Sequence, residues 1–250
     1  DVGESVTLSA SETPNKSDQI PSSGFSWDTD SDGVNDVIGV TTEQSWSEPG
    51  SYSVRLSVTS TDSRSASTTR TISVSDMSPP TVSMAPSEQI TKGFGEEMSV
   101  SATFTDNWGV ESIDWLFDGS IVLSNYSISE PTSTFSIQVS DDYSAGEHVA
   151  SIIVTDKSGI STRQDVTVIF IDVSAPVISP YENQIEVEDG DPTILQIFAQ
   201  DNQSEGLDYT WTFEQGTENE IQFSGPQVIY EFDSEGPTSV VCRVQNDAGL

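Results

Sequence analysis

The sequence predicts an all-β protein that is built as a tandem array of small sandwiches. One pattern occurs three times: a Trp, followed later in the chain by a glycine that opens a strand of alternating apolar residues. Successive copies lie roughly 90 residues apart, which is the size of one immunoglobulin-like sandwich. No stretch shows a sustained helical period. We therefore expect three immunoglobulin-like (Ig-like) β-sandwich domains. The three pairs are Trp27 with Gly50, Trp115 with Gly146, and Trp211 with Gly236.

The composition agrees with small sandwiches. Hydrophobic residues make up only 34% of the 250 residues, and Ser and Thr fill many of the polar positions. One face of each strand in a small sandwich is exposed to water, so a low apolar fraction is expected. A chain of this length suits two or three domains, and the repeat favours three.

The first predicted domain spans residues 1–76. Alternation of apolar and polar residues indicates its strands, and a segment rich in Ser, Pro, Asn and Gly over 11–24 predicts a loop. Consecutive prolines within 76–80 end the domain, because proline cannot continue a central ladder. The strands that we expect are 6–8, 25–27, 52–58 and 69–74, and residues 43–46 lead to the turn that precedes the strand 52–58.

The second predicted domain spans residues 80–173 and the third spans 176–250, with another proline-bearing joint between them. We expect a closing strand at 166–173, and strands at 185–187 and 194–199. In the first two domains a further strand follows the turn that corresponds to 246–250, whereas none follows it here. This pattern indicates either a longer chain or a donor strand from a neighbouring subunit, because an open edge exposes unpaired N–H and C=O groups.

The charge is strongly one-sided. The chain has 41 acidic and 8 basic residues, for a formal net charge of −33. Such a surface has no basic patch to neutralise phosphates, which argues against nucleic acid and against anionic membranes. No long apolar run indicates membrane insertion. Two interpretations remain open: a surface suited to salty surroundings, or carboxylates grouped to hold a divalent metal.

Several motifs resemble the polycystic kidney disease (PKD) domain family. In the first domain these are Gly3–Val6, Phe25–Asp28, Trp46–Gly50 and Tyr52–Val58. The third domain is similar but looser, and the middle one looks more like bacterial Ig-like modules. The resemblance implies β-sandwiches in an extracellular or cell-surface setting, with roles in adhesion, surface layers or spacing within secreted enzymes.

One constellation has the spacing of a metal site. Asp28, Asp30 and Asp32 alternate, a glycine follows, and Asp36 lies four residues after the third carboxylate. This order matches the front half of an EF-hand calcium loop, in which Val34 would offer its backbone carbonyl and Asp36 would ligate through water. These five residues are the predicted metal ligands.

The loop also departs from an EF-hand. Its twelfth position is Gly39 rather than a bidentate Glu, and no helices flank it. It resembles the Asp-rich loops of dockerin-like and thrombospondin type-3 repeats, and Glu43 or solvent would supply a missing ligand. Weak Ca²⁺ binding, at about 10⁻⁴–10⁻³ M, is therefore expected. The alternative is a solvated acidic turn, but repulsion among closely spaced carboxylates favours a cation.

Other acidic residues are weaker candidates. Asp106, Asp156 and Asp201 fall at turns, where Asp commonly makes local hydrogen bonds. Asp76 and Asp172, at the two proline-bearing joints, would suit an ion between domains as in cadherin-like arrays, but no ligand spacing supports that.

The aromatic residues are mostly expected in cores. Trp27, Trp115 and Trp211 each precede a turn in mid-domain, where an indole fills the space between two sheets. Trp108 differs, because it lies within the turn 106–109. It is the candidate for contact with a carbohydrate or protein partner.

Nothing in the sequence indicates an enzyme. His148 aligns with Tyr52 at a core-facing strand position, and Cys242 aligns with the core positions Leu56 and Ile152. We expect both to be structural. No nucleophile elbow, zinc spacing or phosphate loop is present.

Two functions therefore compete. The first is a non-catalytic structural or adhesive array on a cell surface or filament, stiffened by calcium, whose partners are other surface proteins, glycans or copies of itself. The second is an accessory substrate-binding or spacer segment of a secreted hydrolase. Both place the chain outside the cell.

Overall fold

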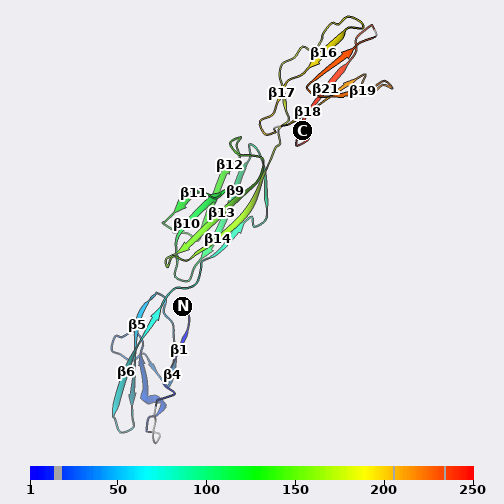
Figure 1. Cartoon of the computed structure of the whole chain (residues 1–250). Coiled ribbons are helices and arrows are strands. Elements are labelled where there is room, and N and C mark those ends of the chain that lie inside the picture. Colours follow the sequence, from blue (N-terminus) through cyan, green and yellow to red (C-terminus); the bar gives the residue numbers. More distant parts are fainter. Residues whose placement is uncertain (14–18, 205, 234) are drawn as a thin grey trace. The chain divides into compact units, whose positions relative to one another are not determined.

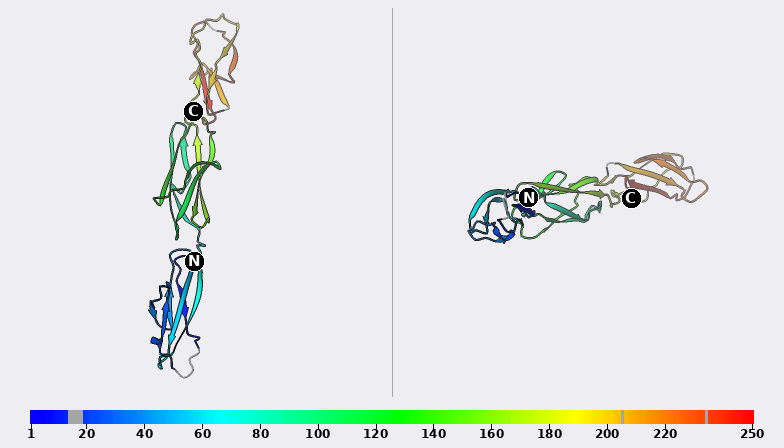
Figure 2. Two further views of the ribbon diagram at one scale, coloured as in Figure 1. Left: turned by 90° about the vertical axis from the view of Figure 1, so that its left-hand side faces the viewer. Right: turned by 90° about the horizontal axis from the view of Figure 1, so that it is seen from below.

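The protein is all-β. The computed structural model describes residues 1–13, 19–204, 206–233 and 235–250. Strands β1 to β21 follow one another along the described chain, with one short 3₁₀ turn at Ser22–Gly24. Strand pairing occurs within three consecutive sets, β1–β6, β7–β14 and β15–β21, which are blue to cyan, green, and yellow to red in Figures 1 and 2. This confirms the predicted fold class.

Two compact units make up the chain. The first contains residues 1–87, 101–134 and 150–165, and the second contains residues 88–100, 135–149 and 166–250. Neither unit coincides with one of the three predicted domains, whose boundaries stay a prediction.

The first set of strands forms two sheets around a small core. One sheet pairs β1 with β4, and the other has the order β3-β2-β5-β6. The core consists of Ala10, Phe25, Trp27, Trp46 and Val54. The bounds are β1 Val6–Ser9, β2 Phe25–Asp28, β3 Val37–Ile38, β4 Thr41–Gln44, β5 Gly50–Thr59 and β6 Ser65–Val74.

The second set has the most deeply buried interior. Its larger sheet has the order β11-β10-β13-β14-β8, and its smaller sheet has the order β12-β9-β7. Met98, Val100, Trp115, Ile152 and Val154 are fully buried. The bounds are β7 Thr81–Ala85, β8 Ile90–Gly93, β9 Glu97–Thr105, β10 Val110–Phe117, β11 Ser120–Asn125, β12 Thr132–Gln138, β13 Gly146–Asp156 and β14 Ser161–Ile171.

The third set is built from shorter pieces. It contains the pairs β15-β17 and β16-β20 and the sheet β19-β18-β21. Its core is formed by Ile197, Trp211, Phe213 and Val228. The bounds are β15 Val177–Ile178, β16 Pro192–Gln196, β17 Ala199–Gln200, β18 Leu207–Phe213, β19 Ile221–Ser224, β20 Gln227–Glu231 and β21 Val240–Asn246.

The threefold repeat is visible in the strand register. Trp27 on β2 pairs with Leu56, Trp115 on β10 pairs with Ile152, and Trp211 on β18 pairs with Cys242. Each Trp is therefore opposite one of the three core-facing positions that the sequence aligned with one another. The prediction that these tryptophans fill the cores is confirmed, since none is more than 6% exposed.

One predicted strand is wrong. Residues 185–187 alternate in sequence but are not part of a strand, and Ile185 and Val187 are 45% and 40% exposed. Three alternating residues are too few to specify pairing without a partner strand in register. The predicted strand 194–199 is divided between β16 and β17, with Ile197 buried between them.

Candidate metal sites

The Asp-rich loop connects β2 to β3 in the first set of strands. Asp28 is the last residue of β2 and is only 2% exposed. The turn that follows needs positive φ at Ser31 (66°) and at Gly33 (87°), and glycine adopts such angles without strain. The Ser31 hydroxyl donates to the carbonyl of Ser53 at 2.6 Å, and the Asp36 N–H donates to the carbonyl of Trp27 at 2.7 Å. The loop is thus anchored to β5 and β2.

Three of the predicted carboxylates converge. Asp28, Asp30 and Asp36 each offer an oxygen, and these oxygens lie within 4.8 Å of one another. Asp28 is buried, whereas Asp30 and Asp36 are exposed. One oxygen of Asp28 accepts the Ser31 N–H at 2.7 Å. The arrangement provides hard oxygen donors of the type that Ca²⁺ prefers.

The other predicted ligands lie outside this group. Asp32 accepts the N–H of Val34 at 2.7 Å, which closes a local turn. Val34 is 64% exposed. Glu43 lies on β4, opposite Thr7, and the Ser5 hydroxyl donates to it at 3.4 Å. The part that these three residues play in binding a metal stays a prediction.

Hydrogen bonds hold Asp36 in its charged form. The backbone N–H of Thr29 donates to Asp36 at 2.7 Å, and the Thr29 hydroxyl donates at 2.8 Å. These two bonds lower the pKa of Asp36 from its ordinary value, because they stabilise the carboxylate rather than the acid. Asp36 therefore stays ionised at neutral pH.

A second group of carboxylates was not identified as a site from the sequence. Asp76, Asp106 and Asp156 also bring their oxygens within 4.8 Å of one another. The three residues are 30 and 50 positions apart along the chain, so no spacing rule could have grouped them.

Trp108 is half-buried rather than fully exposed. Its backbone N–H donates to Asp106 at 2.9 Å, and the Nζ atom of Lys157 lies 6.0 Å from the ring centroid, within range of a cation–π contact. A role for Trp108 in binding a partner stays a prediction.

His148 and Cys242 occupy structural positions. His148 is 7% exposed, its ring lies 4.5 Å from that of Phe170, and its Nε2 atom is 2.8 Å from the carbonyl oxygen of Ser144. Cys242 is half-buried and packs against the third core, and burial raises the pKa of its thiol. A raised pKa disfavours the thiolate, which is the reactive form.

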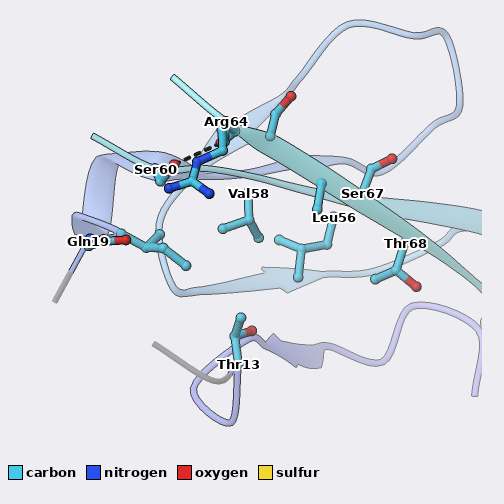
Figure 3. A pocket seen from close by; sticks show the side chains of 11 residues that line it. Thr13, Gln19, Leu56, Val58, Ser60, Arg64, Ser67 and Thr68 are labelled. Carbon is cyan, nitrogen blue, oxygen red and sulfur yellow. Dashed lines mark hydrogen bonds between the residues drawn. The ribbon is translucent and has the colours of Figure 1, made fainter. Parts of the chain in front are cut away.

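An open hollow of about 570 Å³ lies beside β5 and β6. Figure 3 shows Leu56 and Val58 projecting into it, with Thr13, Gln19 and Thr68 around its margin. Thr13 and Gln19 flank residues 14–18, which are outside the described part of the chain. We assign no ligand to this hollow.

One family model matches the chain. Residues 181–250 match the PKD domain, within the third set of strands. PKD and Ig-like domains are generally non-catalytic modules. No curated protein matches the chain. Within the described residues, no helix has the length and apolar character needed to cross a membrane.

Several solved structures that match the chain contain tandem Ig-like or fibronectin-like modules. Titin domains I67–I69 share 13% identity with a TM-score of 0.46, covering 99% of this chain and 90% of that one. Sidekick-1 immunoglobulin domains 1–4 share 12% identity with a TM-score of 0.44, covering 99% and 69%. Fibronectin(III)-like modules of Clostridium thermocellum CbhA share 20% identity with a TM-score of 0.34, covering 68% and 87%. These scores are low, so the fold assignment rests on the strand pairings described above.

Proposed function

We propose that the chain is a non-catalytic extracellular array with a structural or adhesive role, and that its Asp-rich loop binds calcium weakly. The observation that carries this proposal is the repetition of one packing unit, in which a buried Trp is paired with the same core position three times. Tandem repetition of small sandwiches extends a surface for contact with partners. The partners that suit it are other surface proteins, glycans or copies of the chain.

The geometry of the loop supports the calcium part of the proposal. Ca²⁺ takes oxygens at about 2.3–2.6 Å, so two oxygens on one ion lie at most about 5 Å apart. The oxygens of Asp28, Asp30 and Asp36 meet that limit. The two exposed carboxylates leave the site open to solvent, which is consistent with weak binding.

Calcium should slow hydrogen exchange in the region formed by β1–β6, and Asp30→Asn should reduce that effect. Asp30 is exposed and uses one oxygen to accept the Asp32 N–H at 3.1 Å, a bond that an Asn carbonyl can keep. The substitution therefore removes a charge without removing the turn. Hydrogen exchange of peptides from residues 25–38, with calcium and with chelator, reports on this region.

Glu48→Gln is the matched control, because Glu48 is exposed and lies outside the carboxylate group. It should respond to calcium like the unmodified chain. Equal exchange with calcium and with chelator in the unmodified chain would refute calcium binding at this loop.

Sedimentation velocity of the chain alone, and of the chain with soluble glycans, tests the adhesive part of the proposal. Absence of binding to glycans and of self-association would leave only other surface proteins as partners.

A further inference from the structure

The carboxylates of Asp76, Asp106 and Asp156 form a group that is distinct from the Asp-rich loop. Asp76 follows β6, Asp106 follows β9, and Asp156 is the last residue of β13. All three belong to the first compact unit. Asp156 is 1% exposed and Asp76 is 7% exposed. Among the described residues, no Lys or Arg nitrogen lies within ion-pair distance of any of them.

Each of two aspartates uses one oxygen to hold its own turn. The Oδ1 atom of Asp156 accepts the N–H and hydroxyl of Ser158 and the N–H of Ile160, all at 2.8 Å. The Oδ1 atom of Asp106 accepts the N–H groups of Trp108 and Gly109 at 2.9 and 2.8 Å. These bonds fix both carboxylates in position.

The second carboxylate oxygen of each of these two aspartates takes no part in holding its turn. The Oδ2 atoms of Asp106 and Asp156 are buried and have no hydrogen-bond partner among the described residues. Asp76 completes the group: its Oδ1 atom accepts the N–H of Ser78 at 3.2 Å, and its Oδ2 atom accepts the Ser158 hydroxyl at 3.1 Å. A buried acceptor without a partner is costly, and buried carboxylates brought together without a counter-charge add repulsion to that cost.

We propose that Asp76, Asp106 and Asp156 bind a divalent cation, with Ca²⁺ as the best fit. Their oxygens lie within 4.8 Å of one another, which matches pairs of oxygens on one Ca²⁺ ion. An ion there satisfies both orphan oxygens and cancels the repulsion. This site is independent of the Asp-rich loop, because the two groups share no residue.

The second compact unit contains a similar group of three side chains, in which an asparagine replaces one of the three aspartates. Asp172 and Asp201 occupy places that correspond to Asp76 and Asp106, and Asn246 corresponds to Asp156 at the end of its strand. The Nδ2 atom of Asn246 lies 2.8 Å from Asp172 Oδ2 and 3.1 Å from Asp201 Oδ2. It also lies 2.8 Å from the carbonyl oxygen of Ser174.

The amide of Asn246 thus stands where the first group needs a cation. It donates to both carboxylates, so neither Asp172 nor Asp201 has an orphan oxygen among the described residues. Asp156 has no hydrogen to donate at the same place. The two groups therefore differ at one position, where the second has the amide of Asn246 and the first has the carboxylate of Asp156.

The test is to count calcium ions bound to the 250-residue chain by equilibrium dialysis at constant ionic strength. We expect Asp156→Asn to bind one ion fewer than the unmodified chain, and Asn246→Asp to bind one ion more. Asp30→Asn, which alters only the loop, should keep the ion at Asp156. A failure of the Asp-rich loop to bind calcium can therefore be distinguished from a failure of the group at Asp76, Asp106 and Asp156 to bind it.

Hydrogen exchange locates the effect. Calcium should slow exchange in peptides containing 106–109 and 156–160 in the unmodified chain and in the charge-matched control Glu130→Gln, but not in Asp156→Asn. Asp106→Asn, which can keep its turn through the amide carbonyl, should weaken binding by at least about tenfold and gives a second variant if Asp156→Asn does not fold. Unchanged ion counts in both variants, or exchange in these peptides that ignores calcium, would overturn the proposal. Stronger protection by Mg²⁺ than by Ca²⁺ would overturn the choice of ion.

Discussion

The indole of each repeated Trp is held in the same manner. The Nε1–H groups of Trp27, Trp115 and Trp211 each donate at 2.9 Å, to the Gly39 carbonyl, the Ser133 hydroxyl and the Gly225 carbonyl. A buried indole N–H needs such a partner. The sequence was sufficient to place these rings in the cores, because each Trp precedes a mid-domain turn and the same pattern recurs about every 90 residues. It could not reveal the acceptors, which lie on loops or strands of different lengths.

Trp115→Ala should destabilise the second set of strands by about 3–5 kcal/mol. The ring is fully buried, so the substitution leaves a cavity in the interior. Urea denaturation followed by circular dichroism measures the change, and hydrogen exchange assigns it to residues 81–171. Ser133→Ala separates packing from hydrogen bonding, since it removes only the acceptor and should cost about 1–3 kcal/mol. Equal losses for both variants would contradict this division.

The acidic turns show where residue-level prediction reached its limit. Asp106 and Asp156 were expected to make local hydrogen bonds, and one oxygen of each does so. The environment of the other oxygen depends on residues far away in the sequence. Local propensity contains no information about those neighbours, whereas the contiguous loop from Asp28 to Asp36 could be recognised from its spacing alone.

Among the elements, the turn after β17 shows how a short segment is held in place. Asp201 follows β17 and accepts the N–H groups of Gln203 at 2.8 Å and Ser204 at 3.1 Å. The bond from Gln203, followed by those from Asn246 and Ser204, lowers the pKa of Asp201 from its ordinary value. The folded chain therefore binds a proton at Asp201 less tightly than the unfolded chain does.

Asp201→Asn should destabilise the chain at pH 7 and lose that effect in acid. A lowered folded pKa contributes stability that is complete above the unfolded pKa, about 3.9, and disappears as the pH falls through the folded value. Asn has nearly the shape of the protonated acid, so the two proteins should converge at low pH. Urea midpoints at a series of pH values from 7 to below the folded pKa check this. A difference that is independent of pH would show that the charge of Asp201 is not involved.

Strand prediction succeeded where alternation was long and failed where elements were short. The strands β5 and β14 were expected from their regular alternation and are present. Two-residue strands such as β3 and β15 carry too few residues to show a period. The parallel pairing of β8 with β14 was not expected either, because register between distant strands is set by tertiary packing.

At the level of the whole molecule, the dominant property is its charge. A formal net charge of −33 is distributed over all three sets of strands. Carboxylates outnumber cations so greatly that most of them lack an ionic partner within the protein. Mutual repulsion among them opposes the compact state.

Added NaCl should therefore raise the thermal midpoint. The Debye length falls from about 30 Å at 0.01 M to about 3 Å at 1 M ionic strength, which screens repulsion between exposed charges. Differential scanning calorimetry across this range measures the shift. Calcium at matched ionic strength should add a further increase if it binds specifically. A midpoint that does not change with NaCl would contradict the claim that charge repulsion opposes the compact state.

The parallel pairing of β8 with β14 has a mechanical consequence. Residues 90–93 lie beside residues 168–171 and run in the same direction, near the beginning and the end of the second set of strands. A pulling force applied to the chain on both sides of this set draws β8 and β14 in opposite directions along their shared ladder. Its hydrogen bonds are then loaded in shear and must fail together, whereas the bonds of a hairpin pulled from its open end fail one after another. Under tension, this short ladder would set the force at which the second set of strands gives way.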